Sequence, residues 1–154
     1  ITISTSGILS KIKQYIKEKQ KYKLAISLNA SNNNVRNKLI PINKKWKIED
    51  IISALEKYSF NKYRPIMFEY ILIEGINDLE EHAIELANLL KNINCKINII
   101  PYNETKHNYK RSKNIDNFVE SLNKIKGSYR VFIRLSKGQD IDAACGQLAT
   151  KINE

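Results

Sequence analysis

The sequence predicts an α/β protein in which parallel strands alternate with helices. Short segments of β-branched and apolar residues are each followed by a segment whose apolar residues recur at helical spacing. One of the strand-like segments, Ile66–Ile73, is a nearly continuous apolar run, as expected of a strand buried on both faces. Alternation at this spacing indicates a parallel sheet with right-handed crossovers, either open or curled into a barrel.

Each element follows from its local pattern. The expected strands are Ile1–Thr5, Leu24–Asn29, Ile66–Ile73, Lys96–Ile100 and Tyr129–Leu135. The expected helices are Ile8 to about Lys19, Glu49 to Tyr58, the capping-box-like Asn77-Asp78-Leu79-Glu80 to about Lys91, and Ile115–Ile125. Polar loops are expected at Ala30–Asn34, before a short segment that ends at Pro41, and at Pro101–Lys113.

Length and composition limit the possible classes of protein. The 154 residues correspond to one domain, and since the sequence starts at Ile1 within an expected strand, we expect a segment of a longer protein. No apolar stretch approaches the roughly 18 residues of a membrane span. Cys95 and Cys145 form neither a disulfide framework nor a CxxC metal pair, which favours a reducing, cytoplasmic setting.

The net charge of +10 favours a polyanionic partner such as RNA or DNA. An alternative explanation for part of this charge is that Lys, Asn, Ile and Tyr are residues of AT-rich codons. The Pro101–Lys113 loop carries the candidate RNA contacts, which are Lys106, His107, Lys110, Arg111 and Lys113 around Tyr109. An ordinary solvated loop is equally compatible with this pattern. His82, among glutamates, is expected on the surface.

Strand parity predicts one polar sheet face, because successive strand side chains alternate between faces. Thr2, Ser4, Ser27, Asn29 and Asn98 share one parity, Glu69 interrupts the third strand in the same way, and the other parity is apolar. A wide or incomplete barrel that holds a hydrophilic ligand would have such a face. Ser4, Ser27, Asn29 and Asn103 also lie at or just past strand carboxyl ends, where parallel α/β folds bind ligands. Strand-end caps and turn formers are the alternative.

Cys145 lies in the segment Asp140-Ile141-Asp142-Ala143-Ala144-Cys145-Gly146-Gln147-Leu148-Ala149. Small neighbours leave its sulfur sterically open, and a thiolate there would be a nucleophile. Asp140 and Asp142 fit a role in fixing the loop better than one in activating the thiol, because nearby carboxylates raise a thiol pKa. A small buried hydrophobe is the alternative.

Six segments together resemble one known family. They are ITISTSG (1–7), LAISLNAS (24–31), LIPINKKW (39–46), FEYILIEGIND (68–78), CKINIIPYN (95–103) and GQDIDAACGQLA (138–149). In this order they are similar to the C-terminal half of the radical S-adenosylmethionine (SAM) RNA adenine methyltransferases of the RlmN family. The resemblance implies that residues 1–135 form the C-terminal part of a radical-SAM partial (β/α) barrel. Residues 136–154 would then form a segment that carries Cys145.

The resemblance also implies roles for single residues. Ser4, Ser27, Leu28, Asn29 and Asn103 match family positions that contact SAM, and Cys145 matches the cysteine that carries the methyl group. The family usually has histidine at the position of Asn29; asparagine can still donate and accept a hydrogen bond but cannot titrate near neutrality. Cys95 matches no catalytic cysteine and is expected to be structural.

By the same resemblance, the full-length protein would be a cytoplasmic, monomeric enzyme that methylates adenine carbon 2 in 23S rRNA and tRNA. It would use SAM, a [4Fe–4S] cluster and an electron donor. The ligands of the cluster would lie upstream of this segment. A second upstream cysteine would form a disulfide with Cys145 to release the product. This segment would hold no metal and would be inactive alone. The alternatives are a Cfr-type enzyme that methylates adenine carbon 8 and a noncatalytic RNA-binding relative. A nucleotide-binding domain is disfavoured because no glycine-rich phosphate loop is present.

Overall fold

The computed structural model describes residues 1–58, 64–104 and 108–135 of the chain. The strands are β1 (Thr2–Thr5), β2 (Lys23–Ser27), β3 (Ile66–Leu72), β4 (Cys95–Pro101) and β5 (Tyr129–Ile133). The helices are α1 (Leu9–Lys17), α2 (Asn33–Leu39), the 3₁₀ turn η1 (Pro41–Lys44), α3 (Ile48–Glu56), α4 (Glu80–Leu90) and α5 (Ile115–Lys124). No helix among these residues is long and apolar enough to cross a membrane.

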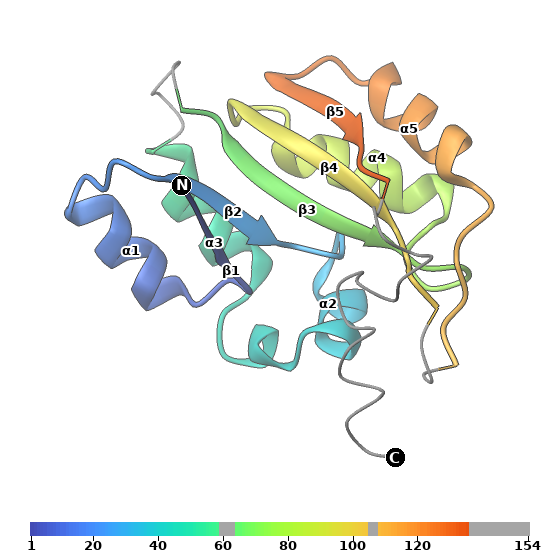
Figure 1. The fold of residues 1–154 in the computed structure, drawn as a ribbon, viewed down its shortest axis with the longest axis horizontal. Coiled ribbons are helices and arrows are strands. Elements are labelled where there is room, and N and C mark those ends of the chain that lie inside the picture. The colour runs from blue at the N-terminus through green and yellow to red at the C-terminus, as the bar shows by residue number, and fades with distance from the viewer. Residues whose placement is uncertain (59–63, 105–107, 136–154) are drawn as a thin grey trace.

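The five strands form one sheet in the order β1-β2-β3-β4-β5, and every neighbouring pair is parallel. In Figure 1, α1 and α3 lie beside β1 and β2, whereas α4 and α5 lie beside β4 and β5. Strands alternate with helices along the chain, as the sequence predicts. Within the described residues β1 and β5 are the two edges, so the sheet is open.

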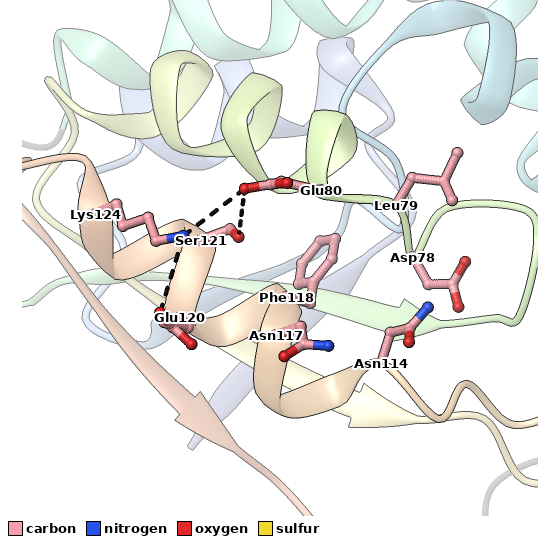
Figure 2. A pocket seen from close by; sticks show the side chains of 9 residues that line it. All are labelled: Asp78, Leu79, Glu80, Asn114, Asn117, Phe118, Glu120, Ser121 and Lys124. Atoms are coloured by element: carbon pink, nitrogen blue, oxygen red, sulfur yellow. Dashed lines mark hydrogen bonds and ion pairs between the residues drawn. The ribbon is translucent and has the colours of Figure 1, made fainter.

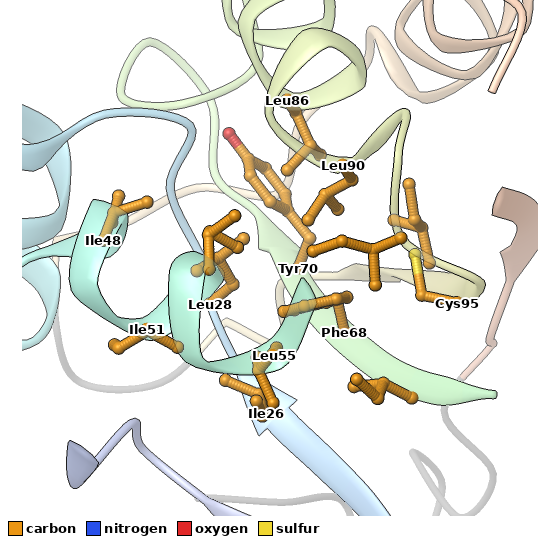
Figure 3. Close-up of a cluster of buried hydrophobic side chains, with 14 of the residues drawn as sticks. Ile26, Leu28, Ile48, Ile51, Leu55, Phe68, Tyr70, Leu86, Leu90 and Cys95 are labelled. Atoms are coloured by element: carbon orange, nitrogen blue, oxygen red, sulfur yellow. The ribbon is translucent and has the colours of Figure 1, made fainter. Parts of the chain in front are cut away.

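A single hydrophobic core lies on one face of this sheet. Its strand residues have one parity, and α1, α3, α4 and α5 all contribute to it; Figure 3 shows part of it, where Ile51 and Leu55 of α3 and Leu86 and Leu90 of α4 pack near Phe68. The apolar parity of β2 and β4 is therefore confirmed, whereas Ile1 and Ile3 at the edge are 92% and 39% exposed.

The other sheet face, called the open face below, is lined by the strand residues of opposite parity. Side chains of β3 and β4 alternate strictly between buried and partly exposed. The expectation that the third strand is buried on both faces is therefore wrong. Its apolar run includes Met67 and Ile71, which lie on the open face and are partly exposed.

Three local expectations differ from the structure. The asparagine run does not stay a loop, because the Asn32 side chain accepts a hydrogen bond from Val35 N and caps α2. Helix α4 begins at Glu80, and Asn77 is fully buried, where its side chain hydrogen bonds to the backbone of Asn29, Ile71 and Ile73. His82 is 7% exposed and not a surface residue; its Nδ1 accepts a hydrogen bond from the amide of Leu79, which has no capping oxygen of its own.

Candidate functional site

Four residues of neighbouring strands form a row across the open face. Ser27, Glu69, Asn98 and Phe132 are aligned by the register of β2, β3, β4 and β5. Because aligned residues of parallel strands point to the same side, a hydroxyl, a carboxylate, an amide and an aromatic ring lie side by side on this face. Strand parity predicted the first three, and the structure brings them together.

Charged and aromatic side chains on the open face connect neighbouring strands. Arg134, just after β5, places Nη1 3.4 Å from Glu69 Oε1 and spans the width of β4. The Glu69 side chain is 20% exposed, whereas that of Arg134 is 66% exposed. Lys96 Nζ lies 5.5 Å from the ring centroid of Phe132, which is itself 44% exposed. The open face thus offers both charges and one exposed aromatic ring.

The backbone that leaves β2 is fixed by β3. The amides of Leu28 and Asn29 both donate to the Glu69 carbonyl, at 3.0 and 3.2 Å. Asn29 has a φ of +56°, in the left-handed region that asparagine tolerates better than most residues. Its Oδ1 accepts a hydrogen bond of 2.9 Å from the amide of Ile71. The side-chain oxygen of Asn29 is therefore occupied by the backbone of β3, and its Nδ2 group remains a potential donor.

The predicted cofactor residues occupy different environments. Ser4 is exposed on β1, Ser27 and Asn29 are partly exposed, and Asn103 is partly exposed beyond β4. Leu28 is fully buried in the core, so any ligand contact of this residue must come from its backbone. The structure brings Ser27 and Asn29 together at the end of β2. The cofactor roles of all these residues stay predictions.

The predicted RNA loop is only partly described. Lys110 and Lys113 are exposed, and Arg111 is partly buried, where it forms an isolated antiparallel bridge with Ile73. Lys106 and His107 lie outside the described residues, as does Cys145 with the whole segment 136–154.

Cys95 is the free cysteine of the described residues. It is 1% exposed, and burial raises the pKa of its thiol to about 12. A thiol of that pKa stays protonated near neutrality and is neither a nucleophile nor a metal ligand. The expectation that Cys95 has a structural role agrees with this environment.

Two hollows on the helical layer lie apart from the predicted residues. One, of about 330 Å³, lies between the start of α4 and α5. Figure 2 shows Lys124 reaching Glu80 and Glu120 there, at 3.8 and 3.9 Å. These side chains are mostly exposed, and such ion pairs contribute roughly 0–1 kcal/mol each. The other, of about 410 Å³, lies between α1 and α3. Neither contains a residue of the polar row, so we place the candidate site on the open face.

Sequence patterns did not single out two residues beneath this site. Arg36 and Asn77 are both fully buried and hydrogen bond to the strand-end backbone. Arg36 is one basic residue in a strongly basic chain, and Asn77 resembled a helix cap. Neither pattern distinguishes such residues from surface or capping residues.

Comparisons with known proteins identify the family. The Spiroplasma citri protein named "Probable dual-specificity RNA methyltransferase RlmN" is 47% identical over 152 residues, 98% of this chain and 44% of that protein. The Dual-specificity RNA methyltransferase RlmN of Buchnera aphidicola is 48% identical over 155 residues, 96% of this chain and 42% of that protein. The chain belongs to the RlmN family. It spans less than half the length of these RlmN relatives.

Solved structures agree with the RlmN assignment. The crystal structure of a radical SAM methyltransferase from Sphaerobacter thermophilus matches with a TM-score of 0.88 and 39% identity, over 96% of this chain and 43% of that one. A domain of pyruvate-formate lyase-activating enzyme from Bacteroides vulgatus matches with a TM-score of 0.64 and 16% identity, which shows a shared fold alone. No protein-family model matches the chain. The predicted fold class, part of a radical-SAM α/β barrel, is confirmed.

Proposed function

We propose that the full-length protein, meaning this chain with the remainder found in its relatives, is a radical SAM methyltransferase that methylates adenine carbon 2 in both 23S rRNA and tRNA. The observation that carries the proposal is the 41–48% identity to RlmN proteins across nearly the whole chain. Adenine carbon 8, the Cfr-type target, is the alternative that product analysis would separate.

The open face fits SAM as a ligand. Its amino-acid end carries an ammonium and a carboxylate, and its ribose carries hydroxyl groups. Ser4 and Ser27 supply hydroxyls that both donate and accept, Asn29 supplies a Nδ2 donor, and Asn103 supplies an amide. The Glu69 carboxylate lies in the same row as Ser27, where it forms an ion pair with Arg134 at 3.4 Å. These residues would bind and orient SAM.

The described residues do not fit an iron–sulfur cluster. They contain no group of three or more His, Cys, Asp or Glu side chains placed to hold a metal ion. The thiol of Cys95 is buried and protonated near neutrality. In the proposed enzyme, the cluster ligands and the site for an electron donor are therefore supplied from outside these residues.

Cys145 is the residue we propose as methyl carrier. When bound, SAM supplies the methyl group and, with a reduced cluster, radical chemistry. The proposed role of this chain is to bind SAM at the strand ends and to present a reactive sulfur. Burial disfavours the thiolate of Cys95, whereas Cys145 lies in the segment that matches the methyl-carrying cysteine of the family and is the thiol that we assign to this role.

RNA is the proposed substrate. The relatives are named as RNA methyltransferases, and a net charge of +10 favours a polyanion. The exposed Lys110 and Lys113, next to Tyr109, are proposed to contact phosphate groups. Tyr109 itself is 38% exposed and meets Tyr102 edge to face, with ring centroids 5.9 Å apart.

Peptide mass spectrometry on Cys145 tests the proposal. The full-length protein is reconstituted with cluster, reductant and SAM, and trypsin then releases Gly138 to Lys151 as one peptide. One added methyl group on Cys145, absent from a Cys145→Ala control, is the expected result. A bare thiol in a protein that demonstrably holds cluster and SAM would overturn the carrier mechanism.

A further inference from the structure

The Arg36 side chain lies at the centre of two strand-end loops. Its Nε donates to the Leu28 carbonyl at 3.1 Å, and Nη2 donates to the Ser6 carbonyl at 2.6 Å and more weakly to that of Ser27 at 3.5 Å. Nη1 donates to Asn43 Oδ1 at 2.9 Å. One guanidinium therefore joins the loop after β1 to the end of β2, a task for which its planar fork of donors is suited.

The charge of Arg36 is unusual for its position. The side chain is fully buried, its four acceptors are neutral oxygens, and burial lowers the pKa to about 10, so the group stays charged near neutrality. Burying an ion without an opposite charge is costly. The four hydrogen bonds of the guanidinium are what offsets this cost.

Gly7 is matched to this arginine. Its φ is +98°, and a Cβ at this position would lie 2.7 Å from Arg36 Nη2 and 2.8 Å from Ile51 Cδ1. Any side chain here would displace the guanidinium from the Ser6 carbonyl. The turn after β1 is therefore built around Arg36.

Asn77 binds the carbonyl of Asn29, the residue that follows Leu28. Its Nδ2 donates to the carbonyls of Asn29 at 2.9 Å and Ile71 at 2.7 Å, and its Oδ1 accepts from the Ile73 amide at 2.8 Å. Tyr70 donates its hydroxyl to the Asn77 carbonyl at 2.8 Å. Asn77 thus ties the end of β2 to the end of β3, with both donors and the acceptor of its amide in use.

We propose that Arg36 and Asn77 are positioning residues for SAM, an inference that rests on the proposed function. They fix the carbonyls of Ser6, Leu28 and Asn29 from the core side. The side chains of Ser4, Ser27 and Asn29, on the same strand ends, are thereby held in fixed positions relative to one another. A binding group must be held by its supporting residues to about half an ångström, and this pair supplies that support at three strand ends.

The test separates positioning from general stability. Arg36→Lys keeps the positive charge but loses the fork, and it is compared with Leu122→Ala, a cavity in α5 away from the strand-end loops. Dissociation constants for SAM and for an RNA substrate are measured on the full-length, cluster-loaded proteins, together with their melting temperatures. We expect Arg36→Lys to weaken SAM binding by roughly tenfold or more and RNA binding by less than about twofold. Leu122→Ala should lose as much thermal stability and keep its affinity for SAM.

Two outcomes would overturn the inference alone. One is wild-type affinity for SAM in folded Arg36→Lys, and the other is an equal loss of SAM affinity in Leu122→Ala. If Arg36→Lys does not fold, Asn77→Ser makes the same test, because it releases the Asn29 and Ile71 carbonyls. Failure of the wild-type protein to bind SAM would instead overturn the proposed function, and the inference with it.

Discussion

Cys95 is the first residue of β4. Its side chain belongs to the same hydrophobic core as Phe68 and Leu90. Burial disfavours the thiolate, and with a pKa of about 12 roughly one thiol in ten thousand is ionised at pH 8. The same burial makes the side chain part of the core. Unfolding should therefore make the thiol reactive, and a substitution at this position should destabilise the fold.

We predict that iodoacetamide at pH 8 leaves Cys95 unmodified in the native full-length protein and modifies it in urea. Cys95→Ser should destabilise the protein by about 1–3 kcal/mol, because it buries a hydroxyl without a partner. Peptide mapping and urea unfolding measure the two effects. Alkylation of native Cys95 as fast as of Cys145 would contradict the assigned environment.

Asn29 combines a left-handed backbone with a side-chain cap on Ile71. Asn29→Ala should lose about 1–3 kcal/mol, since it removes the hydrogen bond and strains the backbone, whereas Asn29→Gly should lose only the hydrogen bond. Unfolding midpoints in urea distinguish the two variants. Equal midpoints for alanine and glycine would show that the left-handed conformation costs nothing here.

Asn29→His tests the departure from the usual family residue. Histidine also tolerates the left-handed region, and an imidazole nitrogen can accept the Ile71 amide. We expect this variant to fold and to bind SAM as the wild type does. A gain in SAM affinity of roughly tenfold would show instead that the imidazole has a role that asparagine does not fill.

Single residues differ in how far the sequence predicts them. Period-two parity placed Ser27, Glu69 and Asn98 on one face, because the pleat alone determines it. Arg36 could not be predicted, since three of its four acceptors are backbone carbonyls, which leave no pattern in a sequence, and one of these belongs to Ser6, thirty residues away. Phe132 on the open face was missed because an exposed aromatic residue looks like a core residue in a strand.

Helix α4 is joined to the loop before α2 by one carboxylate. Ser31 Oγ and Asn32 Nδ2 donate to Glu85 Oε2 at 2.6 and 2.8 Å. Partial burial raises the pKa of Glu85, but these hydrogen bonds together with the nearby charge of His82 outweigh it and hold the pKa below its ordinary value of 4.5. A depressed pKa means that this link stabilises the fold above about pH 4.5 and is lost as the pH falls through the folded-state value.

We predict that Glu85→Gln lowers the melting temperature at pH 7 and that the difference from wild type shrinks as the pH falls below 4.5. Other carboxylates titrate in both proteins, so the difference between the two curves isolates Glu85. Glu81→Gln, an exposed change on the same helix, serves as the control. A wild-type advantage that persists undiminished at low pH would contradict the link.

The sequence predicts those helices and strands whose apolar residues recur with a regular short period. Strands β1 to β5 and helices α1, α3 and α5 agree with expectation to within a few residues. The start of α4 was misplaced because Asn77 and Asp78 look like caps, whereas Asn77 hydrogen bonds to Ile71 of β3 and Asp78 to Ser112. Helix α2 was missed because three asparagines carry a loop signal that the Asn32 cap overrides.

At the largest scale, the described residues form a sheet with two edges whose core face is covered by helices. That order follows from sequential βα units, in which each crossover places the next strand beside the previous one. Among the residues that the structure describes, strand β1 pairs only with β2, and three of its four residues are exposed. Its outward backbone groups can pair with another strand.

We predict that the chain expressed alone self-associates through the free edge of β1. Ile3→Lys should reduce this association, because a lysine on an edge strand opposes pairing with a second chain. Ile84→Lys is the matched control, since Ile84 of α4 is 42% exposed and Ile3 is 39% exposed. Light scattering across a concentration series measures the apparent mass. A concentration-independent monomer in the wild-type chain, or equal effects of the two lysines, would place the association elsewhere than at β1.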